Sequence, residues 1–271
     1  MPTFDSFDKQ NNGSSYSQVV YDFTDKQSKG SFLSRVFGLM FLCLLITTVV
    51  AAGVGFGFQA LILNSATYDP NGSLESLDGN LLLAFFAVII VSAIGLLIMS
   101  FVLPITFARG KHNILVPLII YVVLMGLLLS TFTFLFDWVI LVEAFGITTL
   151  IFGLMAFLGY ISKGRLAGMG FILLGLIIGA VALSLVNWLM ILFGGIQEKN
   201  ITISWIVSLM VFAFLMFVTL YDVNRIKKIA ETGAQHDNNL TYYCAFILYS
   251  DFVSILIRVI YYLAILTGKK R

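Results

Sequence analysis

Long, almost uninterrupted apolar stretches are the feature that most constrains how this chain can fold. A helix needs about 20 mainly apolar residues to cross a bilayer, at 1.5 Å of rise per residue. The sequence predicts seven such helices, over residues 32–59, 81–106, 114–136, 138–161, 166–194, 203–226 and 240–266. These stretches lack the period-two alternation of a membrane β-barrel. The predicted fold class is therefore an all-α integral membrane protein with seven transmembrane helices.

The composition argues against a soluble domain. Hydrophobic residues make up 59% of the 271 residues and charged residues only 11%, whereas a soluble domain carries about 25% charged residues. The mean hydropathy of +0.99 agrees with this. The net charge of +2 is small, and its basic residues are scattered, so no nucleic-acid partner is expected. The lipid bilayer is the expected surrounding.

The two ends of the chain differ from its apolar body. Residues 1–30 are rich in Ser, Asn and Asp and contain no apolar core of a signal peptide, which predicts a disordered cytoplasmic tail. Residues 31–268 form the predicted transmembrane domain, and residues 269–271 a basic C-terminal tail. The two cysteines, Cys43 and Cys244, show no spacing that indicates a metal site or a disulfide framework.

The distribution of Lys and Arg among the short loops predicts the orientation of the spans. Basic residues gather in 107–113, 162–165 and 225–228, whereas 60–80 contains none. The N-terminus is therefore expected inside, and seven spans place the C-terminus outside. The basic ending "GKKR" conflicts with that placement, unless it is tolerated outside or the last segment re-enters and returns. Seven spans are favoured, because the last segment is long enough to cross once and too short to cross back.

Ionisable residues within spans cost about 2.5–3.5 kcal/mol near a helix centre and mark candidate functional sites. They are Arg35, Asp137, Glu143, Asp222, Asp251 and Arg258. Arg35 is expected to snorkel to the cytoplasmic headgroups, and Asp137 to cap the turn between the third and fourth spans. Arg258 either pairs with Glu143 or reaches the outer interface.

Asp222 and Asp251 are the strongest candidates for a site. Asp222, near the inner end of the sixth span, either pairs with a basic residue of its own helix or belongs to a site. Asp251 stands alone in "FILYSDFVSILIR" and needs a partner on another helix, a proton or an ion. Along straight helices the two acids differ in depth by about 13 Å. Helix tilt, or a later start of the seventh span, would bring them together, so the sequence leaves their contact open.

Three motifs in register make the chain resemble the Bax inhibitor motif family of membrane proteins, and its bacterial branch most closely. They are "LVEAFGITTLIFGLMAFLGYISK" (141–163), "TLYDVNRIKK" (219–228) and "LYSDFVSILIRVIYYL" (248–263). The resemblance covers about residues 31–268. It implies six helices around a central seventh, a location in the bacterial cytoplasmic membrane, and a pH-dependent leak of calcium down its gradient.

The resemblance also implies roles for particular residues. Asp222 and Asp251 match a pair of aspartates that shares a proton, and Arg109 in "FARGK" matches a basic latch on the first of them. The sequence departs from the family at Ser254, where an amide residue is usual, at Arg258, which comes earlier than the usual arginine, and in a longer connection between spans six and seven. Glu143 and Arg258 are further candidate pore-lining residues.

The chemistry of such a pair explains how it could gate ions. Two carboxyl groups close together in a low dielectric cannot both ionise cheaply, so they share one proton. Loss of that proton leaves negative charge that repels or recruits a cation. Calcium prefers carboxylate and carbonyl oxygens, and Asp222 with Asp251 would offer it a weak, transient site. No cofactor is expected; calcium and protons act as permeating or regulating ions.

Other function classes have weaker signals. No Walker loop, HExxH or GxSxG motif is present, and His112 and His236 lack metal-ligand spacing. An intramembrane aspartyl protease pairs "YD" with "GxGD", but Asp251 follows Tyr249 and Ser250 without a glycine. An enzyme is therefore not expected. A proton-coupled secondary transporter stays open, although no inverted repeat is visible, as does a regulatory membrane scaffold without transport.

Overall fold

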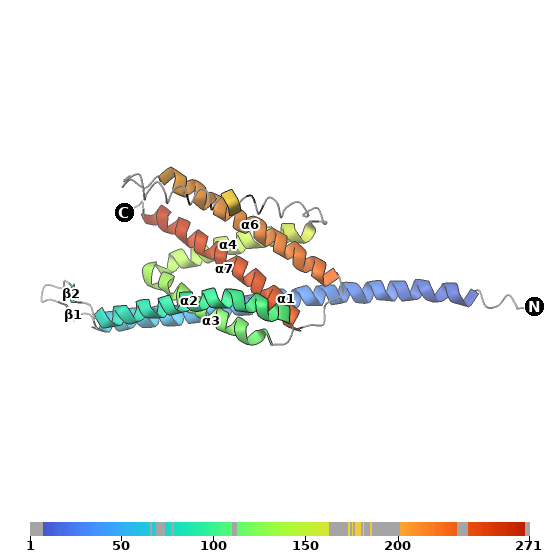
Figure 1. Ribbon diagram of the computed structural model, residues 1–271, viewed down its shortest axis with the longest axis horizontal. Coiled ribbons are helices and arrows are strands. Elements are labelled where there is room, and N and C mark those ends of the chain that lie inside the picture. Colours follow the sequence, from blue (N-terminus) through green and yellow to red (C-terminus); the bar gives the residue numbers. More distant parts are fainter. Residues whose placement is uncertain are drawn as a thin grey trace, which may run out of the picture.

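The computed structural model describes residues 8–65, 67–68, 74–76, 79–109, 113–162, 201–231 and 238–268, with 173, 175, 177–179, 181 and 185. The long helices in these ranges are α1 (Asp8–Ser65), α2 (Gly79–Arg109), α3 (Leu115–Leu135), α4 (Trp138–Ile161), α6 (Ile201–Glu231) and α7 (Asn238–Gly268) (Figure 1). Between α1 and α2, the short strands β1 (Thr67–Tyr68) and β2 (Leu74–Ser76) pair antiparallel.

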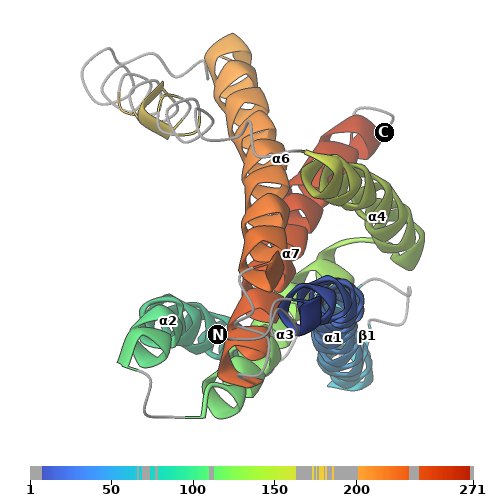
Figure 2. The same ribbon diagram turned by 90° about the vertical axis from the view of Figure 1, so that its right-hand side faces the viewer.

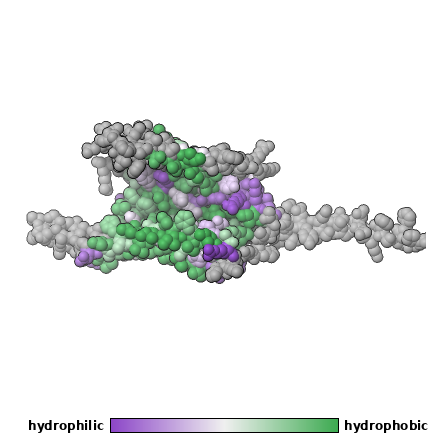
Figure 3. Space-filling view, in the orientation of Figure 1, coloured by the Kyte–Doolittle hydropathy of each residue, from purple (hydrophilic) through white to green (hydrophobic). Residues whose placement is uncertain are grey.

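Each of these six helices contains a segment that is long and apolar enough to cross a membrane. The segments are Gly30–Ile62, Leu83–Arg109, Leu115–Leu135, Trp138–Ile161, Trp205–Glu231 and Asn238–Thr267. Many large apolar side chains on them face outward, and Figure 3 shows a broad hydrophobic surface over the lower layer of helices. The predicted all-α membrane fold is confirmed for these six spans. The expected span at 166–194 falls largely outside the described residues.

Four of the described helices extend beyond their predicted ends, α1 and α6 furthest. α1 begins at Asp8, so the prediction of disorder over residues 1–30 differs from the structure from residue 8 onward; residues 1–7 lie outside the description. Once a helix is nucleated, each further residue adds a hydrogen bond, so the turns of the span can continue into the polar segment. α6 continues to Glu231. The basic residues at 225–228 therefore lie on α6 and not in a loop.

α7 is the most buried of the six described spans. In its most apolar window 61% of residues are buried, against 17–33% in the other five. α1, α2 and α3 run together in one layer, α4 and α6 lie in another, and α7 crosses between them (Figures 1 and 2). Fully buried side chains of α7, among them Leu248, Tyr249 and Ile255, form the centre of the core.

Glycines mark two places where helix backbones approach closely. A Cβ added to Gly126 of α3 would lie 2.7 Å from Val50 Cβ and 3.0 Å from the Thr47 carbonyl oxygen of α1. A Cβ on Gly159 of α4 would lie 2.5 Å from the carbonyl oxygen of Leu220 on α6. Small residues at such crossings let membrane helices pack by direct backbone contact. These crossings hold α1 against α3 and α4 against α6.

Candidate functional site

Asp251 is a buried carboxyl group in the middle of α7. Only 7% of the residue is exposed, and its Oδ2 atom is buried without a hydrogen-bond partner among the described residues. An unpaired buried polar atom costs about 1–3 kcal/mol. The short aspartate side chain cannot reach the membrane surface from this position. The group therefore requires a proton, a water molecule or an ion.

Asp222 lies half-buried on α6. The carboxylate charge of Asp222 interacts electrostatically with Asp251 and with Cys244, both on α7. The positive charge of Arg225, about one turn further along α6, attracts that carboxylate. No hydrogen bond or ion pair of Asp222 is seen with the described part of the chain. The two predicted acids are thus brought within electrostatic range of each other.

The packing of α6 along α7 sets the depth of the two acids. Near the start of α6 and the end of α7, Ser208 Oγ donates to Tyr262 Oη at 3.0 Å, and Arg258 Nη1 donates to Ser208 Oγ at 3.4 Å. Asp222 follows Ser208 by 14 residues on α6, and Leu248 precedes Tyr262 by 14 residues on α7. At 1.5 Å per residue, both lie about 21 Å from the Ser208–Tyr262 contact and so at the same level. Asp251 is therefore only about 4.5 Å from the level of Asp222 along α7.

This is less than the 13 Å or so expected from straight spans aligned to the two faces of a 30 Å core. Both helices, at 31 residues each, are longer than such a core is thick, so the contacts between them set their relative register. A later start of the seventh span, one of the two alternatives that the sequence left open, is compatible with this register.

Side chains near the C-terminal end of α6 hold it against the C-terminal end of α4. The buried Asn224 amide donates from Nδ2 to the carbonyl oxygens of Gly159 at 3.1 Å and Ser162 at 2.8 Å. Lys227 Nζ donates to the Tyr160 carbonyl at 2.8 Å and lies over the Tyr160 ring. The last carbonyl groups of a helix have no partner within it, so α6 supplies partners to α4. These bonds fix the turn of α6 that carries Asp222.

Tyr249, two residues before Asp251, fixes α7 against α1. Its hydroxyl lies 2.5 Å from Thr47 Oγ1, and both residues are buried. Thr47 Oγ1 also donates to the Cys43 carbonyl of its own helix at 2.9 Å, which leaves the tyrosine as donor in the first bond. A buried bond between two helices constrains the rotation of α7, and with it the direction of Asp251.

Thr148 of α4 is a candidate that the sequence analysis missed. The Phe252 ring of α7 contacts the rings of Phe145 and Phe152, each with centroids 5.5 Å apart, so the α4 turn between them packs over this level of α7. Thr148 is fully buried, and its Oγ1 has no hydrogen-bond partner in the described part of the chain. Thr148 and Asp251 thus both carry a buried, unpaired oxygen, Thr148 where α4 packs on α7 and Asp251 one residue before Phe252 of α7. A threonine pair in an apolar run was the only sequence signal.

The remaining predicted site residues lie apart from the two acids. Arg109 is the exposed last residue of α2. Phe107 stacks on Tyr243 with centroids 4.2 Å apart, which holds the C-terminal end of α2 against α7. No ion pair joins Arg109 to Asp222 in the described structure, so the latch stays a prediction.

The structure shows no ion pair between Arg258 and Glu143, both of which lie in its described part. Glu143 is exposed on α4, and Arg258 donates to Ser208 instead. Asp137 is the N-cap residue of α4, at the predicted turn, but its side chain makes no capping hydrogen bond. Arg35 is exposed near the start of the α1 span, a position compatible with snorkelling. A pore-lining role of Glu143 and Arg258 stays a prediction.

The acids form a site with few ligands. In the described ranges, no three His, Cys, Asp or Glu side chains gather as a metal cluster would require. Two carboxyl groups at similar depth can hold a proton between them or attract a cation weakly. Two carboxyl groups without further ligands suit transient binding of a cation more than tight, lasting binding.

Taken together, the spans and the acids on α6 and α7 define a class: a helical integral membrane protein with ionisable groups inside its helix bundle. A family model described as "Inhibitor of apoptosis-promoting Bax1" matches residues 29–268. The chain therefore belongs to this Bax inhibitor family, and the resemblance seen in its motifs is confirmed.

Single proteins that resemble this chain share about 30% of its residues or fewer in the aligned part. The chain is 29% identical over 230 residues to "Inner membrane protein YbhL" of Escherichia coli (strain K12), covering 83% of this chain and 87% of that protein. It is 31% identical over 137 residues to an "Uncharacterized protein" of Deinococcus radiodurans, covering 50% of this chain and 56% of that protein.

Proposed function

We propose that the chain is a pH-sensitive leak channel that lets calcium pass down its gradient across a bacterial inner membrane. The observation that carries the proposal is the Oδ2 atom of Asp251, buried and unpaired on the most buried described helix, with the charge of Asp222 acting on it. Burying an unpaired ionisable group inside a helix bundle lowers stability, so such groups in membrane proteins mark functional sites. Membership of the Bax inhibitor family, and the inner-membrane name of the relative YbhL, add support.

The proposed gate works by charge. When Asp222 and Asp251 share a proton, their repulsion is reduced and α6 stays packed on α7. When the proton leaves, the extra negative charge separates the helices or draws in a cation. Calcium flux should therefore rise with pH. Two carboxylates are far fewer than the six to eight oxygens of a tight calcium site, so calcium binds weakly and passes on.

The proposal includes an arrangement in the membrane. α7 is the central helix with six others around it, the N-terminus is cytoplasmic, and the C-terminus is outside. The high burial of α7 and its contacts with α1, α2, α3, α4 and α6 support its central place. The Lys and Arg bias of the inner segments supports the orientation.

Calcium entry into liposomes that contain the purified protein tests this function. A leak gives entry only down the calcium gradient, with or without a proton gradient. Accumulation of calcium against its gradient, driven by protons, would identify a secondary transporter instead. Absence of flux in both conditions, with protein shown to be folded by circular dichroism, would leave the non-transporting scaffold.

A further inference from the structure

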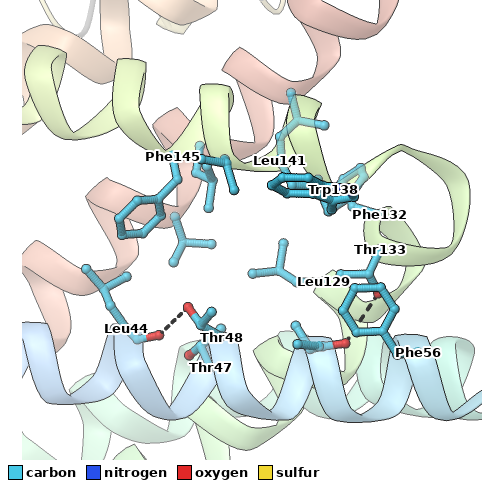
Figure 4. Close-up of a pocket in the computed structure, with 16 residues that line it drawn as sticks. Leu44, Thr47, Thr48, Phe56, Leu129, Phe132, Thr133, Trp138, Leu141 and Phe145 are labelled. Carbon is cyan, nitrogen blue, oxygen red and sulfur yellow. Dashed lines mark hydrogen bonds between the residues drawn. The ribbon is translucent and has the colours of Figure 1, made fainter.

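An elongated apolar pocket lies between α1, α3, α4 and α7, on the side of α7 that carries Val253. Its volume is about 350 Å³. Figure 4 shows Leu44 and Phe145 at one end and Phe56 and Trp138 towards the other. All four helices contain membrane-spanning segments, so the pocket is at membrane depth.

The lining offers a ligand almost no polar group. Apart from the indole N–H of Trp138 at one end, its polar groups are the hydroxyls of three threonines, and each hydroxyl already has a partner. Thr47 bonds with Tyr249, Thr48 donates to the Leu44 carbonyl at 2.8 Å, and Thr133 donates to the Ser130 carbonyl at 2.7 Å. No charged side chain lines the pocket. A polar occupant would lose its hydrogen bonds to water without replacement, so the occupant must be apolar.

The length of the pocket matches one leaflet of a bilayer. From Phe56 to Leu44, α1 spans about 18 Å at 1.5 Å per residue, slightly more than half of a hydrocarbon core about 30 Å thick. Trp138, 66% exposed, stands at the start of α4. Tryptophan is enriched at the interface between membrane and water. The pocket thus runs from the interface near Trp138 towards the middle of the membrane.

We propose that this pocket holds one acyl chain of a phospholipid from the leaflet that contains the α3–α4 turn. The chain enters beside Trp138 and ends near Leu44 and Phe145. An apolar cavity stays dry, and an empty one forfeits dispersion contacts, whereas the bilayer supplies hydrocarbon to its mouth. A bound chain would fill the space between α1 and Val253 of α7. This binding does not depend on ion flux.

Photo-crosslinking tests the occupant directly. The wild-type protein is placed in phosphatidylethanolamine and phosphatidylglycerol vesicles that contain a phospholipid with a diazirine on one acyl chain. Adducts mapped by mass spectrometry should be enriched on Ala52 and Val253, which line the pocket, over Leu97, an exposed residue of α2. Equal or lower labelling of the pocket residues would mean that only bulk membrane lipid contacts the protein, and would overturn the proposal.

A pocket-filling variant provides an independent measurement. Ala52→Trp should lose one phospholipid per protein relative to wild type when detergent-purified samples are compared by native mass spectrometry. Leu150→Trp, on the exposed face of α4, is the matched control and should retain it. Unchanged lipid content in a folded Ala52→Trp protein contradicts the site. If that variant does not fold, the crosslinking of the wild-type chain decides.

Discussion

At the scale of single residues, the surroundings of each carboxyl group decide whether it can take part in a site inside the helix bundle. Asp137 and Glu143 are acids of α4 and of the turn before it, and both are exposed. Asp251 is enclosed by α7 and its neighbours, and Asp222 is half enclosed. Water or headgroups can solvate the first two acids, whereas the second two depend on each other, on protons or on passing ions.

Thr148 offers a test of whether a hydroxyl assists Asp251. Thr148→Val keeps the shape of the side chain and removes its unpaired oxygen. If the oxygen holds a water molecule or ion on the path, calcium flux should fall about fivefold, since about 1 kcal/mol of lost hydrogen bonding corresponds to that factor. Thr148→Ser should restore flux.

The matched control is Thr149→Val, because Thr149 is exposed and its hydroxyl donates to the Phe145 carbonyl of its own helix. Flux in Thr148→Val equal to that in Thr149→Val, accompanied by a gain in stability, would show that the Thr148 hydroxyl is only a packing defect.

Arg109 tests the proposed latch. If it restrains Asp222 in the closed state, Arg109→Ala should increase calcium flux at low pH and weaken the pH response. Arg109→Lys should retain part of both, because lysine keeps the charge but lacks the planar, bidentate guanidinium. Wild-type behaviour of both variants in the liposome assay would reduce Arg109 to a residue that favours the inner side of the membrane.

At the scale of elements, the α4–α6 crossing positions Asp222. Gly159→Ala would place a Cβ against the Leu220 carbonyl of α6, and overpacking of this kind costs about 1–3 kcal/mol. Gly153→Ala is the control on the same helix, since no described atom lies within 4 Å of its added Cβ. It should be neutral or stabilising by about 0.5–1 kcal/mol.

Thermal unfolding in detergent measures both variants. A melting temperature of Gly159→Ala at or above that of Gly153→Ala would mean that the two backbones do not meet there. A lower melting temperature with altered pH dependence of flux would connect the crossing to the gate.

Helix existence could be predicted from the sequence, but helix register could not. Long apolar runs identify six of the spans to within a few residues, because the bilayer sets their length. The α6–α7 register depends on contacts such as Ser208 with Tyr262 and on how far each helix projects beyond the membrane. Those contacts join residues distant in sequence, so the sequence left open how close in depth Asp251 and Asp222 lie.

The same limit applies to side-chain partners. The two acids were identified because charged residues are rare in apolar segments. The Asn224 bonds to α4 and the burial of Thr148 depend on which face each helix turns towards its neighbour, and amides or hydroxyls within spans are too common to reveal it.

At the scale of the whole molecule, the expected topology places the two ends of the chain on opposite sides of the membrane. With Cys43 and Cys244 replaced by alanine, single cysteines at Lys9 and Lys270 should react with a membrane-impermeant maleimide from opposite sides. Cysteines at both positions labelled from the same side would contradict the seven-span topology.

The most direct test of the central claim is a double-substitution cycle of Asp222 and Asp251, measured as calcium entry into liposomes across about pH 6–8, where coupled carboxyl groups can titrate. Asparagine keeps the shape of aspartate but neither titrates nor carries charge. Asp222→Asn should flatten the pH dependence. Asp251→Asn should also lower flux, by about tenfold or more if a charge-assisted contact is lost. Because coupled groups act as a unit, the double variant should cost little more than Asp251→Asn alone. Additive effects, with the pH response intact in each single variant, would mean that the acids act independently and that the gate lies elsewhere.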